Sequence, residues 1–242
     1  MDTIKFKNGN TKVIAHRGCS GLECENSTSA FVAAGMRTYY GIESDVHCTA
    51  DGQYLIFHDD NTARMTDKDF VMEQTDAKTL MSLTLKDKDG TFERRDLVMP
   101  TLTDYFKICK RYEKIAVLEL KNPIPPQHIA AIVAVARDMG YFEQTVFISF
   151  YPENVIALRQ MEPTANIQFL SNMELTDEII GLLEQYKVDL DIEYHKLDAE
   201  KIQKLHARGI TVNCWTCDDR DAAEQLAAWG IDYITTNILE GE

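Results

Sequence analysis

The chain has 242 residues, 45% of them hydrophobic, so it can bury one sizeable core and we expect a single domain spanning 1–242. Its first twelve residues are polar and no later apolar run reaches the length of a membrane span, so neither a secretion signal nor stable membrane insertion is expected. The formal net charge of −14 disfavours nucleic acid and anionic lipid as partners, and six scattered cysteines are typical of reduced thiols in the cytoplasm.

Short β-branched or apolar runs alternate with helical stretches along the whole chain. This alternation is typical of βα units and a parallel sheet. Eight runs are predicted to be strands, at residues 12–15, 41–45, 115–120, 145–150, 166–170, 188–192, 210–215 and 232–236. The predicted fold class is therefore α/β, a TIM-type (β/α)8 barrel with a small insertion after a hairpin on the second strand.

A ninth apolar run, residues 54–58, follows residues 46–49 after only four residues that include Asp51 and Gly52. A parallel crossover needs a dozen or more residues, whereas Asp-Gly between apolar runs favours a hairpin. This run should therefore return antiparallel to the second strand. Counting back from the turn predicts that His58 lies roughly across from Glu43.

Capping residues and prolines mark the starts of several helices between the strands. Asn26 or a neighbouring serine can cap the first of them. The predicted helices cover residues 27–36, about 103–112, 152–161, 177–186 and the segment from Asp198 to Gly209.

Residues 61–99 are polar, rich in Asp and Lys, and without a barrel period. They predict an insertion above the barrel. Such an insertion either shapes a substrate cleft or forms a loose surface loop. No repeat at a solenoid period interrupts the single barrel domain.

The first two strands place chemically useful side chains where barrel enzymes keep their active sites. The first strand ends in His16 and Arg17, and the second carries Glu43 and Asp45. Alternate residues of a strand face the same side, so both carboxylates should point together. Taken singly, a histidine at a strand end is more often a structural hydrogen-bonding group, and two acids are more often solvated.

The third strand adds Glu119, again at the end of an apolar run and next to the second strand in a simple barrel. Like charges about 4 Å apart repel by about 4 kcal/mol at an effective dielectric constant near 20. Three converging carboxylates are therefore stable only when protonated or neutralised by a cation. All-oxygen ligation suits a hard divalent cation, Mg²⁺ or Ca²⁺, with Mn²⁺ as a further option, and disfavours zinc.

Two imidazoles, His16 and His58, should flank that cation, with Arg17 and Lys121 as further positive groups. This set matches the needs of a phosphodiester. The cations offset charge on its non-bridging oxygens, one imidazole removes a proton from the nucleophile, and the other protonates the leaving alkoxide.

At this point the sequence resembles the glycerophosphodiester phosphodiesterase family over nearly its whole length. The matching stretches, in chain order, are His16-Arg17-Gly18, Glu25-Asn26-Ser27-Thr28, Glu43-Ser44-Asp45-Val46-His47, Asp51-Gly52, His58-Asp59-Asp60, Pro100-Thr101-Leu102, Leu118-Glu119-Leu120-Lys121, Ser149-Phe150 and Asn213-Cys214-Trp215-Thr216.

The resemblance implies a cytoplasmic hydrolase of glycerol and lipid metabolism. It would cleave small glycerophosphodiesters, such as glycerophosphocholine or glycerophosphoethanolamine, into an alcohol and sn-glycerol 3-phosphate. It also implies metal ligation by Glu43, Asp45 and Glu119, acid and base roles for His16 and His58, and phosphate contacts from Arg17 and Lys121.

Trp215, at the end of a predicted strand, packs either on the substrate or at the barrel rim. Two departures from the family pattern are Cys24, where proline is usual, and Asn237, where aspartate is commoner. Neither is expected to touch the proposed catalytic set, although Asn237 could alter ligand contacts.

Other functions remain open at this stage. A lysophospholipase D-like enzyme acting on lipid substrates would need an apolar funnel at the cleft. A barrel lyase would use Lys121 as a Schiff-base amine, since such an amine at a strand end is what that chemistry requires. A barrel that only binds phosphorylated ligands is disfavoured by the complete set of reactive residues. A homodimer is compatible with the sequence but not indicated by it.

Overall fold

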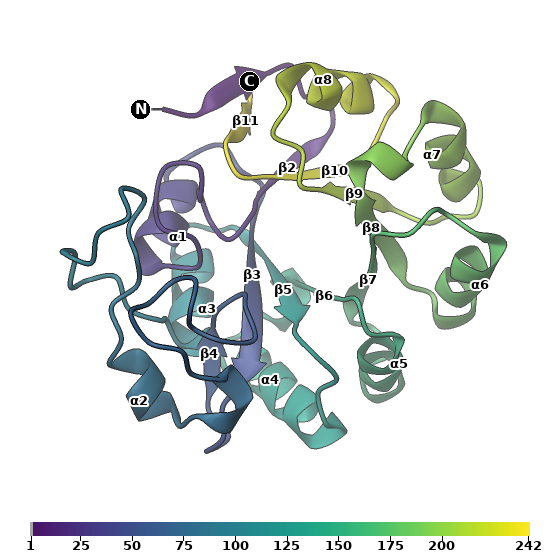
Figure 1. Cartoon of the computed structure of the whole chain (residues 1–242). Coiled ribbons are helices and arrows are strands. Elements are labelled where there is room, and N and C mark those ends of the chain that lie inside the picture. The colour runs from purple at the N-terminus through teal and green to yellow at the C-terminus, as the bar shows by residue number, and fades with distance from the viewer. Residues whose placement is uncertain (1) are drawn as a thin grey trace.

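The computed structural model describes residues 2–242 and contains a closed barrel of eight parallel strands with helices around it (Figure 1). The last strand pairs with the first, and the first pairs with the second, so the ring has no open edge. The strands are β2 (Lys12–Ala15), β3 (Gly41–Cys48), β5 (Ile115–Leu120), β6 (Thr145–Ser149), β7 (Asn166–Ser171), β8 (Asp189–Glu193), β9 (Val212–Trp215) and β10 (Tyr233–Thr236). The predicted TIM-type barrel is confirmed.

The predicted hairpin is also present, because β4 (Tyr54–Ile56) returns antiparallel to β3. Its register differs by one residue from the predicted pairing of His58 with Glu43. Val46 lies opposite Ile56, which aligns His58 with Ser44 beyond the last ladder pair. The register is set at the turn, where the backbone N–H of Thr49 bonds the carbonyl of Gln53 at 2.9 Å and leaves three residues between them.

Seven helices of eight or more residues surround the barrel, and their ends follow the predicted signals. Side chains of Ser27, Thr176 and Asp198 accept the capping hydrogen bonds, and Pro152 begins its helix. The helices are α1 (Thr28–Gly35), α3 (Leu102–Arg111), α4 (Pro126–Asp138), α5 (Pro152–Met161), α6 (Asp177–Tyr186), α7 (Ala199–His206) and α8 (Arg220–Ala228). Within residues 2–242, no helix has both the length and the apolar character needed to cross a membrane.

Alternation along the strands divides the core into two parts. Outward side chains such as Leu118 and Ile192 pack under the helices in the main hydrophobic cluster. Inward side chains, among them Ile14, Ile148 and Leu170, fill the barrel interior as a separate and smaller cluster. Polar side chains that face inward from these strands therefore share the barrel interior with apolar side chains.

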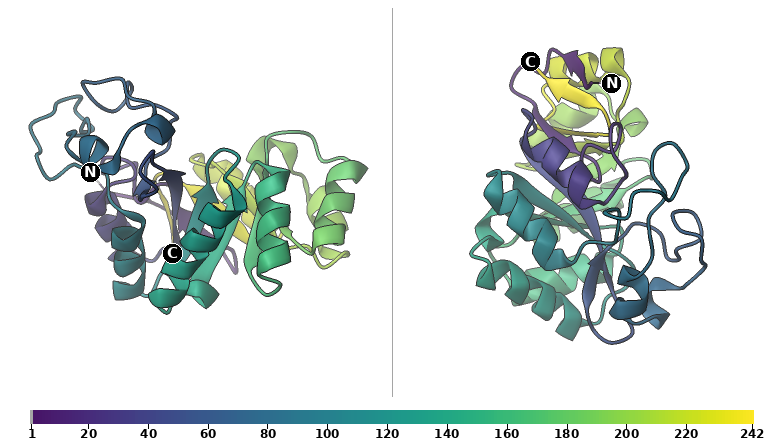
Figure 2. Two further views of the ribbon diagram at one scale, coloured as in Figure 1. Left: turned by 90° about the horizontal axis from the view of Figure 1, so that it is seen from below. Right: turned by 90° about the vertical axis from the view of Figure 1, so that its left-hand side faces the viewer.

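The segment that follows β4 has a hydrophobic cluster of its own. It includes the short helices η1 (Met72–Gln74) and α2 (Ala77–Met81), whose Met72 and Leu80 are fully buried. They pack with Leu55 and Phe57 of the hairpin. Figure 2 shows this segment standing above the helices on one side of the barrel. Residues 61–99 are therefore a packed structure and not a loose loop.

Two short strands were not predicted. β1 (Ile4–Phe6) and β11 (Leu239–Gly241) pair in parallel and bring the two ends of the chain together. The ammonium of Lys5 lies 2.8 Å from a carboxylate oxygen of the buried Glu240. Three-residue strands show no measurable alternation, and their pairing depends on residues more than 230 positions apart, as in Ile4 with Leu239.

Tyr105 of α3 ties together the two strands that carry the acidic residues. Its hydroxyl contacts the carbonyl oxygen of Ile42 on β3 at 2.7 Å and that of Val117 on β5 at 3.1 Å. The side chain is fully buried. This hydrogen bonding holds β3 and β5 in place immediately before Glu43 and Glu119.

We expect Tyr105→Phe to lower the free energy of unfolding by about 1–2 kcal/mol, because two buried carbonyls lose a donor. Tyr112→Phe is the matched control, since Tyr112 is a half-buried tyrosine at the C-terminal end of the same helix, with its ring packed beside Gly35. Urea unfolding measures both variants. Equal stability of the two would contradict the role given to Tyr105.

Candidate active site

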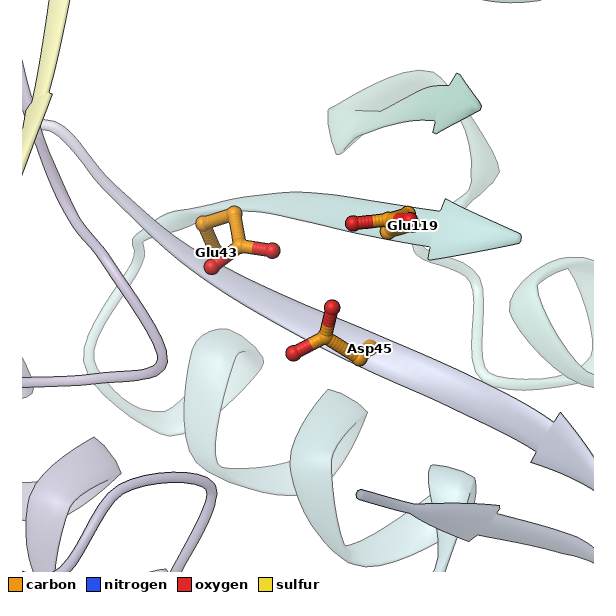
Figure 3. Close-up of side chains that lie close together, drawn as sticks. All are labelled: Glu43, Asp45 and Glu119. Carbon is orange, nitrogen blue, oxygen red and sulfur yellow. The ribbon is translucent and has the colours of Figure 1, made fainter. Parts of the chain in front are cut away.

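Three carboxylates from two neighbouring strands converge at one point inside the barrel (Figure 3). Glu43 and Asp45 face inward from β3, and the register places Asp45 directly beside Glu119 of β5. One carboxylate oxygen from each lies within 4.8 Å of the others, and all three side chains are buried. The predicted acidic trio is therefore assembled by strand alternation and register alone.

Positive and polar groups surround the acids. The ammonium of Lys121 lies 2.9 Å from Glu119 and 3.6 Å from Asp45. The backbone N–H of Arg17 donates to Glu43 at 2.8 Å. The buried Nε of Arg17 lies 3.7 Å from Asp45 and has no hydrogen-bond partner among residues 2–242. These contacts compensate the acids only in part, since two cations face three carboxyl groups.

The pKa values reflect this imbalance. Burial and the nearby Asp45 raise the pKa of Glu43 well above its ordinary value, and the same two causes raise the pKa of Glu119 to about 8. Burial would also raise the pKa of Asp45, but Lys121 and Arg17 outweigh it and hold that pKa below the usual range. Two of the three acids therefore retain protons unless a cation replaces them, and the all-oxygen donor set fits a hard divalent ion.

A tight turn after β2 brings Arg17 to the acids. Arg17 and Gly18 both have positive φ angles, 53° and 78°. A Cβ at Gly18 would lie 2.7 Å from the backbone of Ala30, so this position accepts only glycine. The turn is what points the Arg17 amide at Glu43.

His16 is oriented by Asn237, one of the two departures from the family pattern. Asn237 Oδ1 lies 2.8 Å from His16 Nδ1, and the amide of Asn237 donates to Asp218 through Nδ2 at 2.6 Å. The carboxylate thus fixes the amide orientation, so Nδ1 of His16 is the donor and Nε2 faces Glu43 at 3.9 Å. The expectation that Asn237 does not touch the catalytic set is wrong, because the chain after β10 passes directly behind His16.

Burial, followed by the neighbouring charge of Arg17, lowers the pKa of His16 to about 4. The ring is therefore neutral at neutral pH. With Nδ1 protonated and bonded to a neutral amide, Nε2 presents a lone pair to the cavity.

His58 has a different partner. Its Nδ1 contacts Asp59 at 2.6 Å, and Asp59 is held by Arg64 from the inserted segment, with an Nε to carboxylate distance of 2.6 Å. Arg64 also binds Glu25 at 2.6 Å, and Glu25 in turn accepts from Arg17 at 2.9 Å. An alternating chain of charges therefore links the two sides of the site through Arg64.

Both histidines open onto one cavity of about 60 Å³ together with Glu43 and Glu119. Apolar side chains form part of its wall, with Trp215 and Phe150 in edge-to-face contact at a centroid distance of 5.4 Å. Trp215 thus contacts the cavity and does not merely cover the rim. A second, more open groove leads outward, lined by His58, Asp59, Asp60, Glu119, Lys121, Asn122, Phe150 and Tyr151.

The structure brings all eight predicted residues to this place: His16, Arg17, Glu43, Asp45, His58, Glu119, Lys121 and Trp215. The sequence analysis gave no role to Asn26, whose amide donates to Asp45 at 2.7 Å, to Arg64, or to Asp191 on the cavity floor. Alternation along residues 188–192 could have revealed Asp191 as an inward side chain. Nothing local identifies Arg64.

Known proteins match this chain over nearly its whole length. A model of the "Glycerophosphoryl diester phosphodiesterase family" matches residues 16–240. A glycerophosphodiester phosphodiesterase of Caldanaerobacter subterraneus subsp. tengcongensis is 26% identical over 234 residues, covering 94% of both chains. One from Bacillus subtilis is 24% identical over 247 residues, covering 93% of this chain and 82% of the relative.

Among solved structures, a phosphodiesterase of Oleispira antarctica in complex with the product sn-glycerol-3-phosphate superposes with a TM-score of 0.86 at 27% identity. The match covers 93% of this chain and 92% of that one. A glycerophosphodiester phosphodiesterase from Parabacteroides distasonis gives a TM-score of 0.79 at 27% identity, with 94% and 93% coverage.

The acidic trio predicts a pH-dependent response to metal. The pKa of Glu119 is about 8 in the folded protein against an ordinary 4.5, so between these pH values the native state holds a proton that the unfolded chain releases. Without metal, the free energy of unfolding therefore falls as the pH rises from about 4.5 to about 8. Saturating Ca²⁺ or Mg²⁺ should raise the Tm by about 5–10 °C at pH near 8 and by much less at pH near 5, where protons compete for the ligands.

Thermal unfolding with and without the ion measures this effect. The Glu43→Gln/Glu119→Gln double variant is the control and should show no metal-dependent shift. A shift of equal size at both pH values, or one that persists in the double variant, would place the ion elsewhere.

Proposed function

The chain belongs to the glycerophosphoryl diester phosphodiesterase family, and from that premise we propose that it hydrolyses small glycerophosphodiesters, such as glycerophosphocholine, to an alcohol and sn-glycerol 3-phosphate. One observation carries the proposal: two imidazoles share a single cavity with Glu43 and Glu119, and the carboxylates of these two residues converge with that of Asp45. The proposal includes one barrel domain over 1–242, a cytoplasmic location and a small-molecule substrate as the partner.

The different partners of the two histidines support different roles for them. His16 bonds a neutral amide, which favours the neutral ring, so its Nε2 is suited to take the proton of the attacking oxygen. Burial lowers the pKa of His58, but its bond to the carboxylate of Asp59 opposes that shift, and the negative charge of a bound phosphodiester would favour the imidazolium form further. His58 would then protonate the leaving alkoxide as the P–O bond to the alcohol breaks, on the side of the open groove.

Arg17 and Lys121 would hold the phosphate. Burial by itself lowers the pKa of each of these side chains. The neighbouring acids, Asp45 foremost, outweigh burial and raise both pKa values above normal, so both side chains remain charged. Glu43, Asp45 and Glu119 would hold one Mg²⁺ or Ca²⁺, or Mn²⁺ in their place. When bound, that ion supplies further positive charge against the non-bridging oxygens of the phosphate.

The charge on Lys121 argues against a Schiff-base lyase. That chemistry requires a free amine, and an ammonium at 2.9 Å from Glu119 with a raised pKa is a poor nucleophile.

A lysophospholipase D-like activity on lipid substrates is a second candidate, favoured by one feature. A largely apolar groove adjoins the cavity and shares Phe150 and Leu170 with it, and the exposed Met173 lies along the groove. Such a surface could take an acyl chain. Release of choline from lysophosphatidylcholine, set against release from glycerophosphocholine, distinguishes the two substrates.

Substitution of the reactive residues tests the leading proposal. His16→Ala and Glu119→Ala should each lower kcat/KM for glycerophosphocholine by at least about a hundredfold, because each removes a proton-transfer or charge-balancing group. His195→Ala is the control and should behave as wild type, since His195 is exposed, pairs with Glu193 and lines neither the cavity nor the open groove. EDTA should abolish turnover and Mg²⁺ or Ca²⁺ restore it, with glycerol phosphate release as the readout. Wild-type turnover in either variant would end the proposal.

Arg64 should matter to the reaction although it is half exposed. We expect Arg64→Met to lower kcat by about tenfold with little change in KM, because Asp59 and His58 lose their orienting partner. Arg94→Met is the matched control: Arg94 lies in the same segment and forms ion pairs with Glu23 at 2.8 Å and Asp96 at 2.7 Å, away from the site. Equal effects in both variants would show that only the folding of the segment matters.

A further inference from the structure

Asp191 is a buried carboxyl group on the floor of the cavity that the mechanism above does not use. It lies in the middle of β8, between the outward-facing Leu190 and Ile192, so its side chain points into the barrel. The residue is 2% exposed, and within residues 2–242 its Oδ1 has no hydrogen-bond partner. A buried polar atom without a partner that borders a cavity is a group that a ligand can satisfy.

The polar neighbours of Asp191 are largely engaged with one another. Asn213, beside it on β9, donates to Gln168 at 3.3 Å and accepts from the hydroxyl of Thr235 at 3.2 Å. Its side chain also offers the Asp191 carboxyl a hydrogen bond that opposes the rise in the pKa of Asp191, but within residues 2–242 Oδ1 stays without a partner. Trp215 directs its ring N–H to the backbone carbonyl of Asp191 and not to the carboxyl group. The carboxyl is therefore left facing the cavity.

The surroundings of Asp191 favour a neutral hydroxyl as its partner. Burial, followed by the charge of Glu119, raises the pKa of Asp191 well above its ordinary value and so favours the neutral carboxylic acid. Such a group both donates and accepts one hydrogen bond, as does an alcohol. The walls nearby are the apolar side chains of Ile148 and Leu170, against which carbon atoms pack.

The cavity and the open groove would also accommodate different parts of the substrate. The cavity is much smaller than the open groove next to His58 and Tyr151, so the short glycerol end of the substrate suits the cavity and the variable alcohol can extend into the groove. Glycerol bound in the cavity through its phosphate would direct its terminal hydroxyl toward the floor.

We propose that Asp191 binds the sn-1 hydroxyl of the glycerol moiety and thereby selects fully deacylated glycerophosphodiesters. The inference rests on the proposed function and names a specificity residue for it. A substrate that carries an acyl group on this oxygen lacks the hydroxyl hydrogen and exceeds the space, so lysophospholipids should be excluded.

The test compares glycerophosphocholine with an analogue in which hydrogen replaces the sn-1 hydroxyl while the 2-hydroxyl is kept. Wild-type enzyme should show a kcat/KM about tenfold to a hundredfold lower for the analogue. In Asp191→Leu the activity on glycerophosphocholine should fall by that factor, while activity on the analogue should stay within about threefold of wild type. Asp191→Asn, which keeps a donor and an acceptor in the same shape, should retain the discrimination.

Equal discrimination in wild type and Asp191→Leu would overturn the inference. If the leucine variant does not fold, the wild-type enzyme still decides the question. A wild-type preference for glycerophosphocholine over the analogue of less than about threefold would overturn the inference. Turnover of 1-acyl lysophosphatidylcholine at the rate of glycerophosphocholine would overturn it as well. These outcomes differ from failure of the proposed function, in which wild-type protein releases no glycerol phosphate from any glycerophosphodiester with Mg²⁺, Ca²⁺ or Mn²⁺ and both conclusions fall.

Discussion

Mutual repulsion among Glu43, Asp45 and Glu119 is the constraint around which the rest of the site is arranged. Their oxygens lie within 4.8 Å of one another in a buried place, where each unneutralised pair opposes folding. Lys121 and Arg17 reduce that repulsion but do not cancel it. The remaining deficit of positive charge suits the site to a divalent cation, and that cation together with Arg17 and Lys121 would in turn suit it to an anionic substrate.

The same need for charge balance explains why an inserted segment belongs to the active site. Arg64 comes from this segment, yet it connects Glu25, beside Arg17, with Asp59, beside His58. The hydrophobic cluster around Leu80 and Met72 gives the segment a fixed shape from which Arg64 can reach. A barrel without this segment would keep both histidines but lose the contact that links their carboxylate neighbours.

Barrel geometry also separates the chemistry from substrate selection. Polar groups at the strand ends, such as His16 and Lys121, surround the acidic residues, whereas Asp191 lies in the middle of β8 and lines the cavity with the apolar Ile148 and Leu170. Groups with different proposed roles therefore come from different parts of the strands. The deep cavity and the open groove give the two ends of a diester different surroundings, which a single shallow cleft could not provide.

The sequence by itself determined whatever depends on neighbouring residues: the eight strands from their apolar runs, the Asp51-Gly52 hairpin, the helix starts at Pro152 and after Thr176, and the shared face of Glu43 and Asp45. Only the tertiary structure decided contacts between distant segments. Asn237 meets His16 across 221 positions, Arg64 meets Glu25 across 39, and β1 pairs with β11. Alternation and capping are local properties that a sequence carries directly, whereas these contacts arise because closing the barrel and packing the insertion bring together residues that have no local pattern in common.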